Sequence, residues 1–100
     1  MLKLKSMRDA APGKRIFVIE DEGEPASGEA LDRLASIACR LIQENGLPGD
    51  FEVFGVGLLV LNLRASDRSF FHDGIVFAAL DAVNDPNRNP TLTQISLEPE

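Results

Sequence analysis

The one histidine of the chain is followed directly by an aspartate, His72-Asp73. An imidazole that is oriented by a carboxylate is the pattern of a general base, so this pair is the first candidate for chemistry. Adjacent side chains on one chain seldom point toward each other, however, and Asp73 before Gly74 is typical of a helix N-cap. We therefore expect a structural role for the pair and assign no catalytic residue.

The chain also carries a short acidic segment, here called the acidic loop, which is made of Glu20, Asp21, Glu22 and Glu24. Carboxylates together with water can hold magnesium, but a solvated turn at the end of a strand accounts for the same residues. No basic residue occurs from residue 20 to residue 32. We predict that the acidic loop binds a protein partner with a basic surface, because such charge speeds encounter more than it adds final affinity.

No other residues form a metal or cofactor site in the sequence. The single cysteine, Cys39, falls at the edge of an apolar helix stripe and is expected to act as a small hydrophobe. One His and one Cys do not supply a metal-ligand set. Gly55-Val56-Gly57 lacks the third glycine and the following helix of a phosphate-binding loop. We expect no metal and no cofactor, and the unpaired thiol fits a reducing cytoplasm.

Charge and hydropathy argue against two classes of partner. The formal net charge is −6, whereas nucleic-acid binding depends on Lys and Arg. No apolar run reaches the roughly 18 residues of a membrane helix, and the first residues lack the apolar region of a signal peptide. We expect neither nucleic acid nor membrane as a partner. Residues 1–100 are predicted to form one domain, long enough to bury a core without disulfides.

The most apolar stretch runs from residue 51 to residue 63, and it predicts two strands, 51–54 and 58–63. The glycines of Gly55-Val56-Gly57 favour a hairpin turn between them, and one long bulged strand is the alternative. Leu58 to Leu61 is apolar at every position, which is typical of a strand covered on both faces. A second buried strand is predicted over 16–19.

Two helices are predicted around these strands. The first begins after the N-cap Ser27 and ends at Asn45-Gly46, with an apolar stripe formed by Leu31, Leu34, Ala35, Ala38, Leu41 and Ile42. The second covers about residues 73–84. Alternation over 91–97 predicts a last, half-exposed strand. Leu2 and Leu4 alternate with lysines, so residues 1–14 form either a loose arm or an extra N-terminal edge strand.

The element order is strand, helix, strand, strand, helix, strand. This β-α-β-β-α-β order predicts a ferredoxin-like α+β fold, with a mainly antiparallel single-layer sheet and two helices packed on one face. Such a sheet leaves one face open, whereas Leu58 to Leu61 is apolar on both. Either the N-terminal segment folds over that face or a second copy covers it, and we expect a homodimer.

Parts of the chain resemble two-component receiver domains. Residues 15–22, Arg-Ile-Phe-Val-Ile-Glu-Asp-Glu, resemble their first strand and acidic pair. Residues 58–67 resemble their third strand, with Asn62 in the position of the phosphorylated aspartate, and residues 72–75 resemble the piece that follows. The resemblance implies a parallel sheet and a truncated adaptor. Such an adaptor would be inactive in phosphorylation, because an asparagine at this position cannot form an acyl phosphate.

Three functions therefore remain open on the sequence. The first is a small regulatory or inhibitory protein-binding module that acts through the acidic loop and an exposed sheet surface. The second is a small enzyme or ligand-binding domain with a pocket between sheet and helices, using His72 or Asp73. The third is the receiver-like adaptor, which a parallel sheet would identify.

Overall fold

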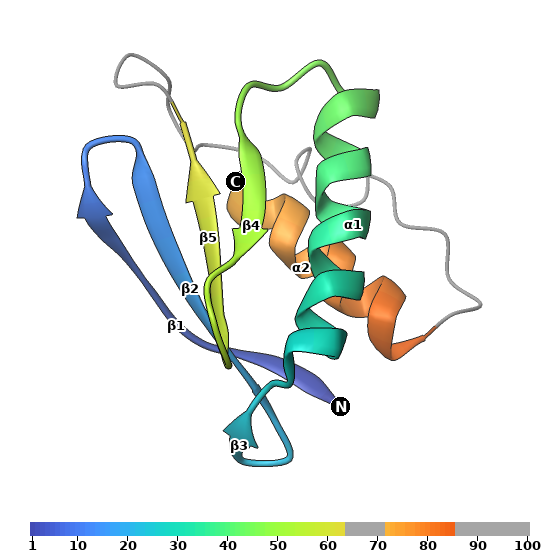
Figure 1. The fold of residues 1–100 in the computed structure, drawn as a ribbon. Coiled ribbons are helices and arrows are strands. Elements are labelled where there is room, and N and C mark those ends of the chain that lie inside the picture. Colours follow the sequence, from blue (N-terminus) through green and yellow to red (C-terminus); the bar gives the residue numbers. More distant parts are fainter. Residues whose placement is uncertain (64–71, 86–100) are drawn as a thin grey trace, which may run out of the picture.

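The described part of the chain folds into one antiparallel sheet with two helices on one of its faces (Figure 1). The computed structural model describes residues 1–63 and 72–85, so the strand predicted over 91–97 lies outside the described residues. The sheet order is β1-β2-β5-β4. The short β3 pairs with the last two residues of β2, on the side away from β1 and beyond the end of the pairing with β5. The elements are β1 (Leu2–Ala11), β2 (Lys14–Asp21), β3 (Glu24–Pro25), α1 (Gly28–Glu44), β4 (Asp50–Val53), β5 (Leu58–Asn62) and α2 (His72–Asn84).

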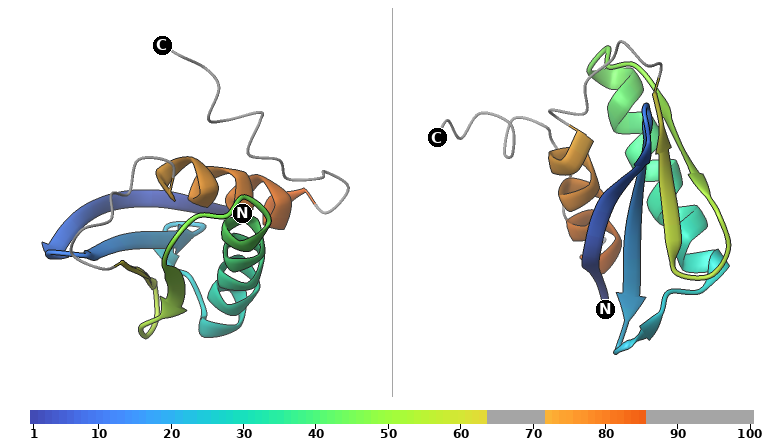
Figure 2. Two further views of the ribbon diagram at one scale, coloured as in Figure 1. Left: turned by 90° about the horizontal axis from the view of Figure 1, so that it is seen from above. Right: turned by 90° about the vertical axis from the view of Figure 1, so that its left-hand side faces the viewer.

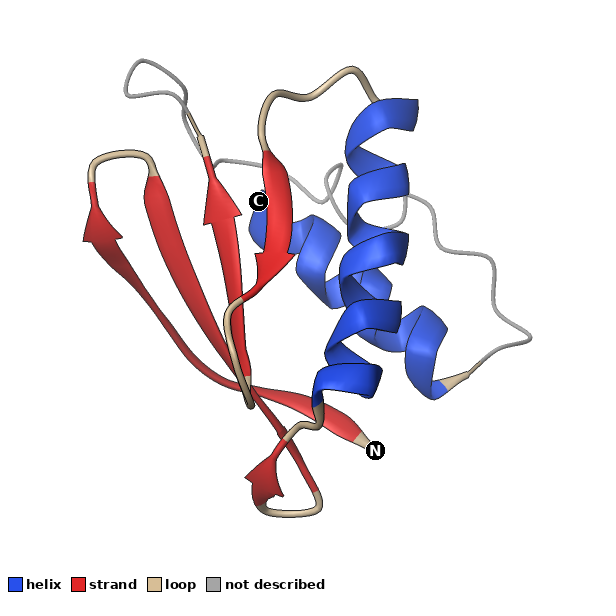
Figure 3. Cartoon of the chain, in the orientation of Figure 1, coloured by secondary structure: helices blue, strands red, loops and turns tan. Residues whose placement is uncertain are grey.

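The predicted α+β class is confirmed, and Figure 3 shows both helices beside the sheet. The described pairings β1–β2, β2–β3, β2–β5 and β4–β5 are all antiparallel. Among the described strands, β2, β4 and β5 correspond to the first three strands of a ferredoxin-like sheet in order and direction. The parallel sheet implied by the receiver resemblance is therefore wrong for the described strands.

The N-terminal segment forms a long edge strand and not a loose arm. β1 pairs with β2 from Leu2↔Asp21 to Ala11↔Lys14, with register shifts near Lys5 and Ala10. It occupies the place beside β2 that a ferredoxin-like sheet gives to its last strand. The strand ends at Ala11. The alternation of Leu2 and Leu4 with lysines signals only its first part, and the exposed residues that follow carry no hydrophobic pattern.

The apolar centre forms the predicted hairpin of two strands, β4 and β5. The backbone of Gly55 has φ of 91° and that of Gly57 has φ of 78°, a left-handed conformation that favours glycine. A side chain at Gly57 would also place its Cβ 2.9 Å from the Cβ of Pro25. The turn therefore needs glycine for its conformation and for its close approach to β3.

Helix α1 agrees with its predicted start, stop and buried face. The Ser27 side chain accepts a hydrogen bond from the Ala30 backbone N–H at 3.2 Å, which caps the helix. Gly46 follows the last turn with φ of 64°. All members of the predicted stripe are buried: Leu31, Leu34, Ala35, Ala38, Leu41 and Ile42.

Helix α2 begins one residue earlier than predicted, at His72. Asp73 therefore lies in the first turn and is not the N-cap that the sequence suggested. A carboxylate in the first turn still suits the helix dipole. Neither described helix is long and apolar enough to cross a membrane.

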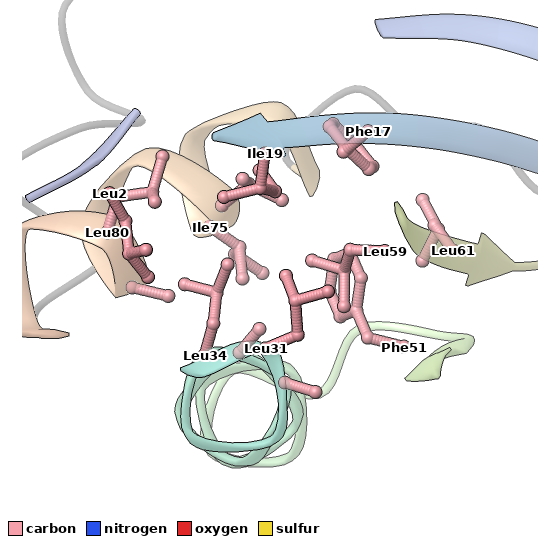
Figure 4. Close-up of a cluster of buried hydrophobic side chains, with 14 of the residues drawn as sticks. Leu2, Phe17, Ile19, Leu31, Leu34, Phe51, Leu59, Leu61, Ile75 and Leu80 are labelled. Atoms are coloured by element: carbon pink, nitrogen blue, oxygen red, sulfur yellow. The ribbon is translucent and has the colours of Figure 1, made fainter. Parts of the chain in front are cut away.

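The core lies between the sheet and the two helices (Figure 4). Alternate residues of the central strands face it, including Phe17, Ile19, Leu59 and Leu61, each with no exposed surface. The other residues of these strands face the opposite side, which carries no described helix (Figure 2). We call that side the open face. The N-terminal segment lies beside β2 in the sheet, so it does not fold over the open face.

Candidate functional site

His72 is buried at the start of α2. Its side chain is 1% exposed, and its Nε2 lies 2.8 Å from the carbonyl oxygen of Pro48. A carbonyl can only accept, so Nε2 carries the hydrogen and donates it. The ring also lies against Phe51, with 6.5 Å between the ring centroids. Nδ1 is buried and has no hydrogen-bond partner within the described part of the chain.

Asp73 is held by Arg15 and not by its neighbour His72. The Nη1 atom of Arg15 donates to both carboxylate oxygens of Asp73, at 2.8 and 2.9 Å. The Nε atom of the same guanidinium donates to Asp9 at 2.8 Å. Arg15 thereby lowers the pKa of the Asp9 carboxyl, and the hydrogen bond to Asp9 is the main cause that raises the pKa of Arg15. The contacts join β1, β2 and α2, and they do not orient His72 as a base.

Cys39 and the acidic side chains form no metal-ligand set in residues 1–63 and 72–85. The Cys39 thiol is half-buried and lies 3.6 Å from the carbonyl oxygen of Phe51. Its surroundings are those of a small core side chain, as its place on the helix edge suggested.

The acidic loop forms the hairpin between β2 and β3. Asp21 pairs with Glu24 across it, and Glu22 stands at the turn with φ of 55°. The N-terminal amine of Met1 lies 2.8 Å from a carboxylate oxygen of Asp21 and 2.8 Å from one of Glu22. Hydrogen bonds to these carboxylates raise the pKa of the amine above its usual 8.0.

These contacts correct one expectation from the sequence, which showed no positive charge near the acidic loop. The pairing of β1 with β2 places the Met1 amine next to the acidic loop, and Lys3 lies opposite Glu20 in the same strand pair. Glu24 is exposed and makes no ion pair with any described residue. The loop is therefore partly neutralised on the β1 side and remains acidic on the β3 side.

The turn between β4 and β5 lies directly beside the acidic loop (Figure 1). The Gly57 backbone N–H donates to the carbonyl of Ala26 at 2.9 Å, and the Ile19 N–H donates to the carbonyl of Gly57 at 2.8 Å. The neighbouring side chains Phe54 and Val56 are 65% and 64% exposed. Two exposed large apolar side chains therefore belong to a turn whose backbone is hydrogen-bonded to β2 and to Ala26, the residue after β3.

Sequence reasoning did not identify Phe54 and Val56 as surface residues. Both belong to the most apolar stretch of the chain, which as a whole indicates burial. Their position next to Gly55 and Gly57 was the one available signal, because side chains at the tip of a tight hairpin usually face water.

Asn62 lies on the open face at the opposite end of the sheet from the acidic loop. Its Oδ1 accepts from the Nζ of Lys14 at 2.6 Å, and its Nδ2 donates to Asp50 at 3.3 Å and to Glu52. The side chain thus connects β2, β5 and β4. It takes part in a structural polar cluster, which differs from the role that the receiver resemblance placed at this position.

No protein-family model matches the chain, and searches of curated proteins and of solved structures found no match either. A function can therefore be inferred only from the surfaces and contacts described above.

Proposed function

We propose that this chain is a small protein-binding module, regulatory or inhibitory in its effect, that binds a basic surface of a protein partner through the acidic loop. The observation that supports this best is the exposed apolar side chain of Val56, in a turn whose backbone is hydrogen-bonded to Ile19 and Ala26, which flank that loop. Apolar anchors surrounded by charged groups are the usual composition of a protein-binding surface. The unpaired thiol of Cys39 suits a reducing compartment, so we place the module in the cytoplasm.

The two parts of the surface have different tasks. The carboxylates attract a positively charged partner and raise the rate of encounter, an effect that salt weakens because the Debye length is about 10 Å at 0.1 M. Val56 then loses contact with water in the complex, and its burial slows dissociation. Glu24 contributes most to the attraction among the four carboxylates, since Met1 and Lys3 lie near the other three.

The enzymatic alternative finds less support. It needs His72 and Asp73 as a cooperating pair, but the imidazole is bonded to Pro48 and the carboxylate to Arg15. Each side chain connects elements of the core, a role that needs no substrate.

The test is capture of a partner from the native host on the immobilised chain, followed by binding measurements with the purified partner. The informative variant is Glu22→Lys combined with Glu24→Lys, which reverses two exposed charges of the acidic loop. The matched control makes the same change on α1, with Asp32→Lys combined with Glu44→Lys, also at exposed positions. The partner should bind the parent and the control alike and bind the loop variant severalfold more weakly at low salt.

A second variant, Val56→Ser, tests the apolar anchor without changing charge. It should speed dissociation and leave association nearly unchanged, because a neutral side chain does not steer encounter. A captured protein that binds all variants with the affinity of the parent would show that the acidic loop is not the binding site.

A further inference from the structure

The open face carries charges of opposite sign at its two edges. Residues that pair across neighbouring strands share a face of the sheet. One row across the open face therefore reads Arg8 on β1, Ile16 on β2, Val60 on β5 and Glu52 on β4. The row runs from a basic edge through an apolar centre to an acidic edge.

A second row has the same order of charges. It reads Lys14 on β2, Asn62 on β5 and Asp50 on β4. The β1–β2 side of the open face is thus basic and the β4 side is acidic in both rows, although the chain as a whole carries a formal charge of −6.

The centre of the open face is apolar. Ile16, Val18 and Leu58 are half-buried, Val60 is 6% exposed, and the alternation of β4 continued by one residue places Phe54 beside Leu58. Both described helices lie on the opposite side of the sheet, and no described element packs over this one (Figure 2). An apolar sheet face with charged edges of opposite sign suits the open face of an identical chain.

We infer that the open face binds the open face of a second copy, about a twofold axis that runs along the strands between the two sheets. Such a rotation exchanges the two edges, so the β1 edge of one copy lies over the β4 edge of the other. Arg8 of each copy then faces Glu52 of the other, across the roughly 10 Å that separate packed sheets. A twofold axis across the strands would instead place Arg8 over Arg8, and that like-charge contact disfavours it.

A dimer formed by pairing of two β1 edges is less favourable than one formed by the open faces. The outer strand carries Lys3, Lys5 and Arg8, and its register is interrupted near Lys5 and Ala10. Charged side chains and bulges are the features by which edge strands resist pairing with another chain.

The orientation has a consequence for partner binding, which rests on the proposed function. Rotation about an axis along the strands leaves each end of the sheet at the same end of the dimer. Both acidic loops then lie at the same end of the dimer, and so do the two β4–β5 turns that carry Val56. A partner with two basic segments would engage both copies and gain apparent affinity through the second contact.

The test is the solution mass of the protein and of two charge-reversed variants, measured by sedimentation over a range of concentrations. The parent should sediment as a dimer. Arg8→Glu and Glu52→Arg should each raise the dimer dissociation constant about tenfold or more, because each opposes like charges twice in one dimer. An equal mixture of the two variants should dimerise like the parent, since Glu at position 8 then meets Arg at position 52 and the other contact is unchanged.

The matched controls carry the same charge changes on α1, with Arg33→Glu and Glu44→Arg, and should sediment like the parent. Far-UV circular dichroism checks that every variant is folded. A parent that stays monomeric at all concentrations overturns the proposal, as do single variants that remain dimers or a mixture that remains monomeric. None of these readouts involves the partner, so they leave the proposed function to its own experiment.

Discussion

Truncation of Leu34 to alanine should remove a large part of the stability of this domain. Leu34 has no exposed surface, and its side chain points from α1 into the core shared with α2 and the sheet (Figure 4). The change deletes three carbon groups, whose transfer from water contributes about 0.8 kcal/mol each. The cavity left between two helices and a sheet cannot collapse fully, which brings the expected cost to about 3–4 kcal/mol.

Urea unfolding followed by circular dichroism measures this loss, and no Trp or Tyr is present to serve as a fluorescent probe. A domain of this size has a total stability of about 5–15 kcal/mol and a urea slope of about 1–1.5 kcal/mol per molar. The midpoint should therefore fall by roughly 2–4 M with an unchanged slope. Protein concentration must be the same throughout, because dimerisation would shift the midpoint.

The control is Ser36→Ala, an exposed position on the same helix, where the change should stay within about 0.5 kcal/mol. If Leu34→Ala and Ser36→Ala had the same midpoint, the assignment of the buried face of α1 would be wrong, and with it the packing of the helix on the sheet.

Two further predictions concern the backbone and the response to acid. Gly49→Ala should lower the free energy of unfolding by about 1–3 kcal/mol in a thermal melt, because the φ of Gly49 is 95° and a Cβ there would lie 2.5 Å from Cδ2 of Leu63. The control is Gly28→Ala, whose Cβ would meet nothing within 4 Å, so this change should be neutral or slightly stabilising. Arg15 lowers the pKa of Asp9 below its usual 3.8, so the stability from this contact is fully present above pH 3.8 and is lost as pH falls through the folded-state pKa. Unfolding measured from roughly pH 5 to pH 2 should show a shallower acid loss in Asp9→Asn than in the parent, and parallel curves would contradict this prediction.

Regular patterns in the sequence predicted helix α1 and the central hairpin. The apolar stripe of α1 repeats at helical spacing, and its ends carry Ser27 and Gly46, which are a favoured cap and a favoured stop. The hairpin follows from two apolar runs separated by glycines. In both cases the local signal and the buried contacts agree, which is the condition under which single-sequence reasoning works.

The features that depend on strand register could not be predicted in the same way. β1 is mostly polar after Leu4, so its length is set by backbone pairing with β2 and not by burial. The role of Asp73 also escaped prediction, because its partner Arg15 comes from a strand far away in the sequence.

The candidate surfaces were partly visible in the sequence. The acidic loop was identified from four close carboxylates, but the approach of the Met1 amine requires β1 to be placed beside β2. The opposite charges of Arg8 and Glu52 on one face follow from a register that runs through four strands. No pattern along the chain places those two residues in the same row.

The central claim is that the acidic loop steers a basic protein partner, and the association rate constant of the purified partner tests it most directly. We predict that Glu22→Lys combined with Glu24→Lys slows association severalfold at low salt and that the difference shrinks as salt is added. The dissociation rate should change much less, because these exposed carboxylates contribute mainly to encounter. Equal association rates for the parent and this variant at low salt would contradict the claim.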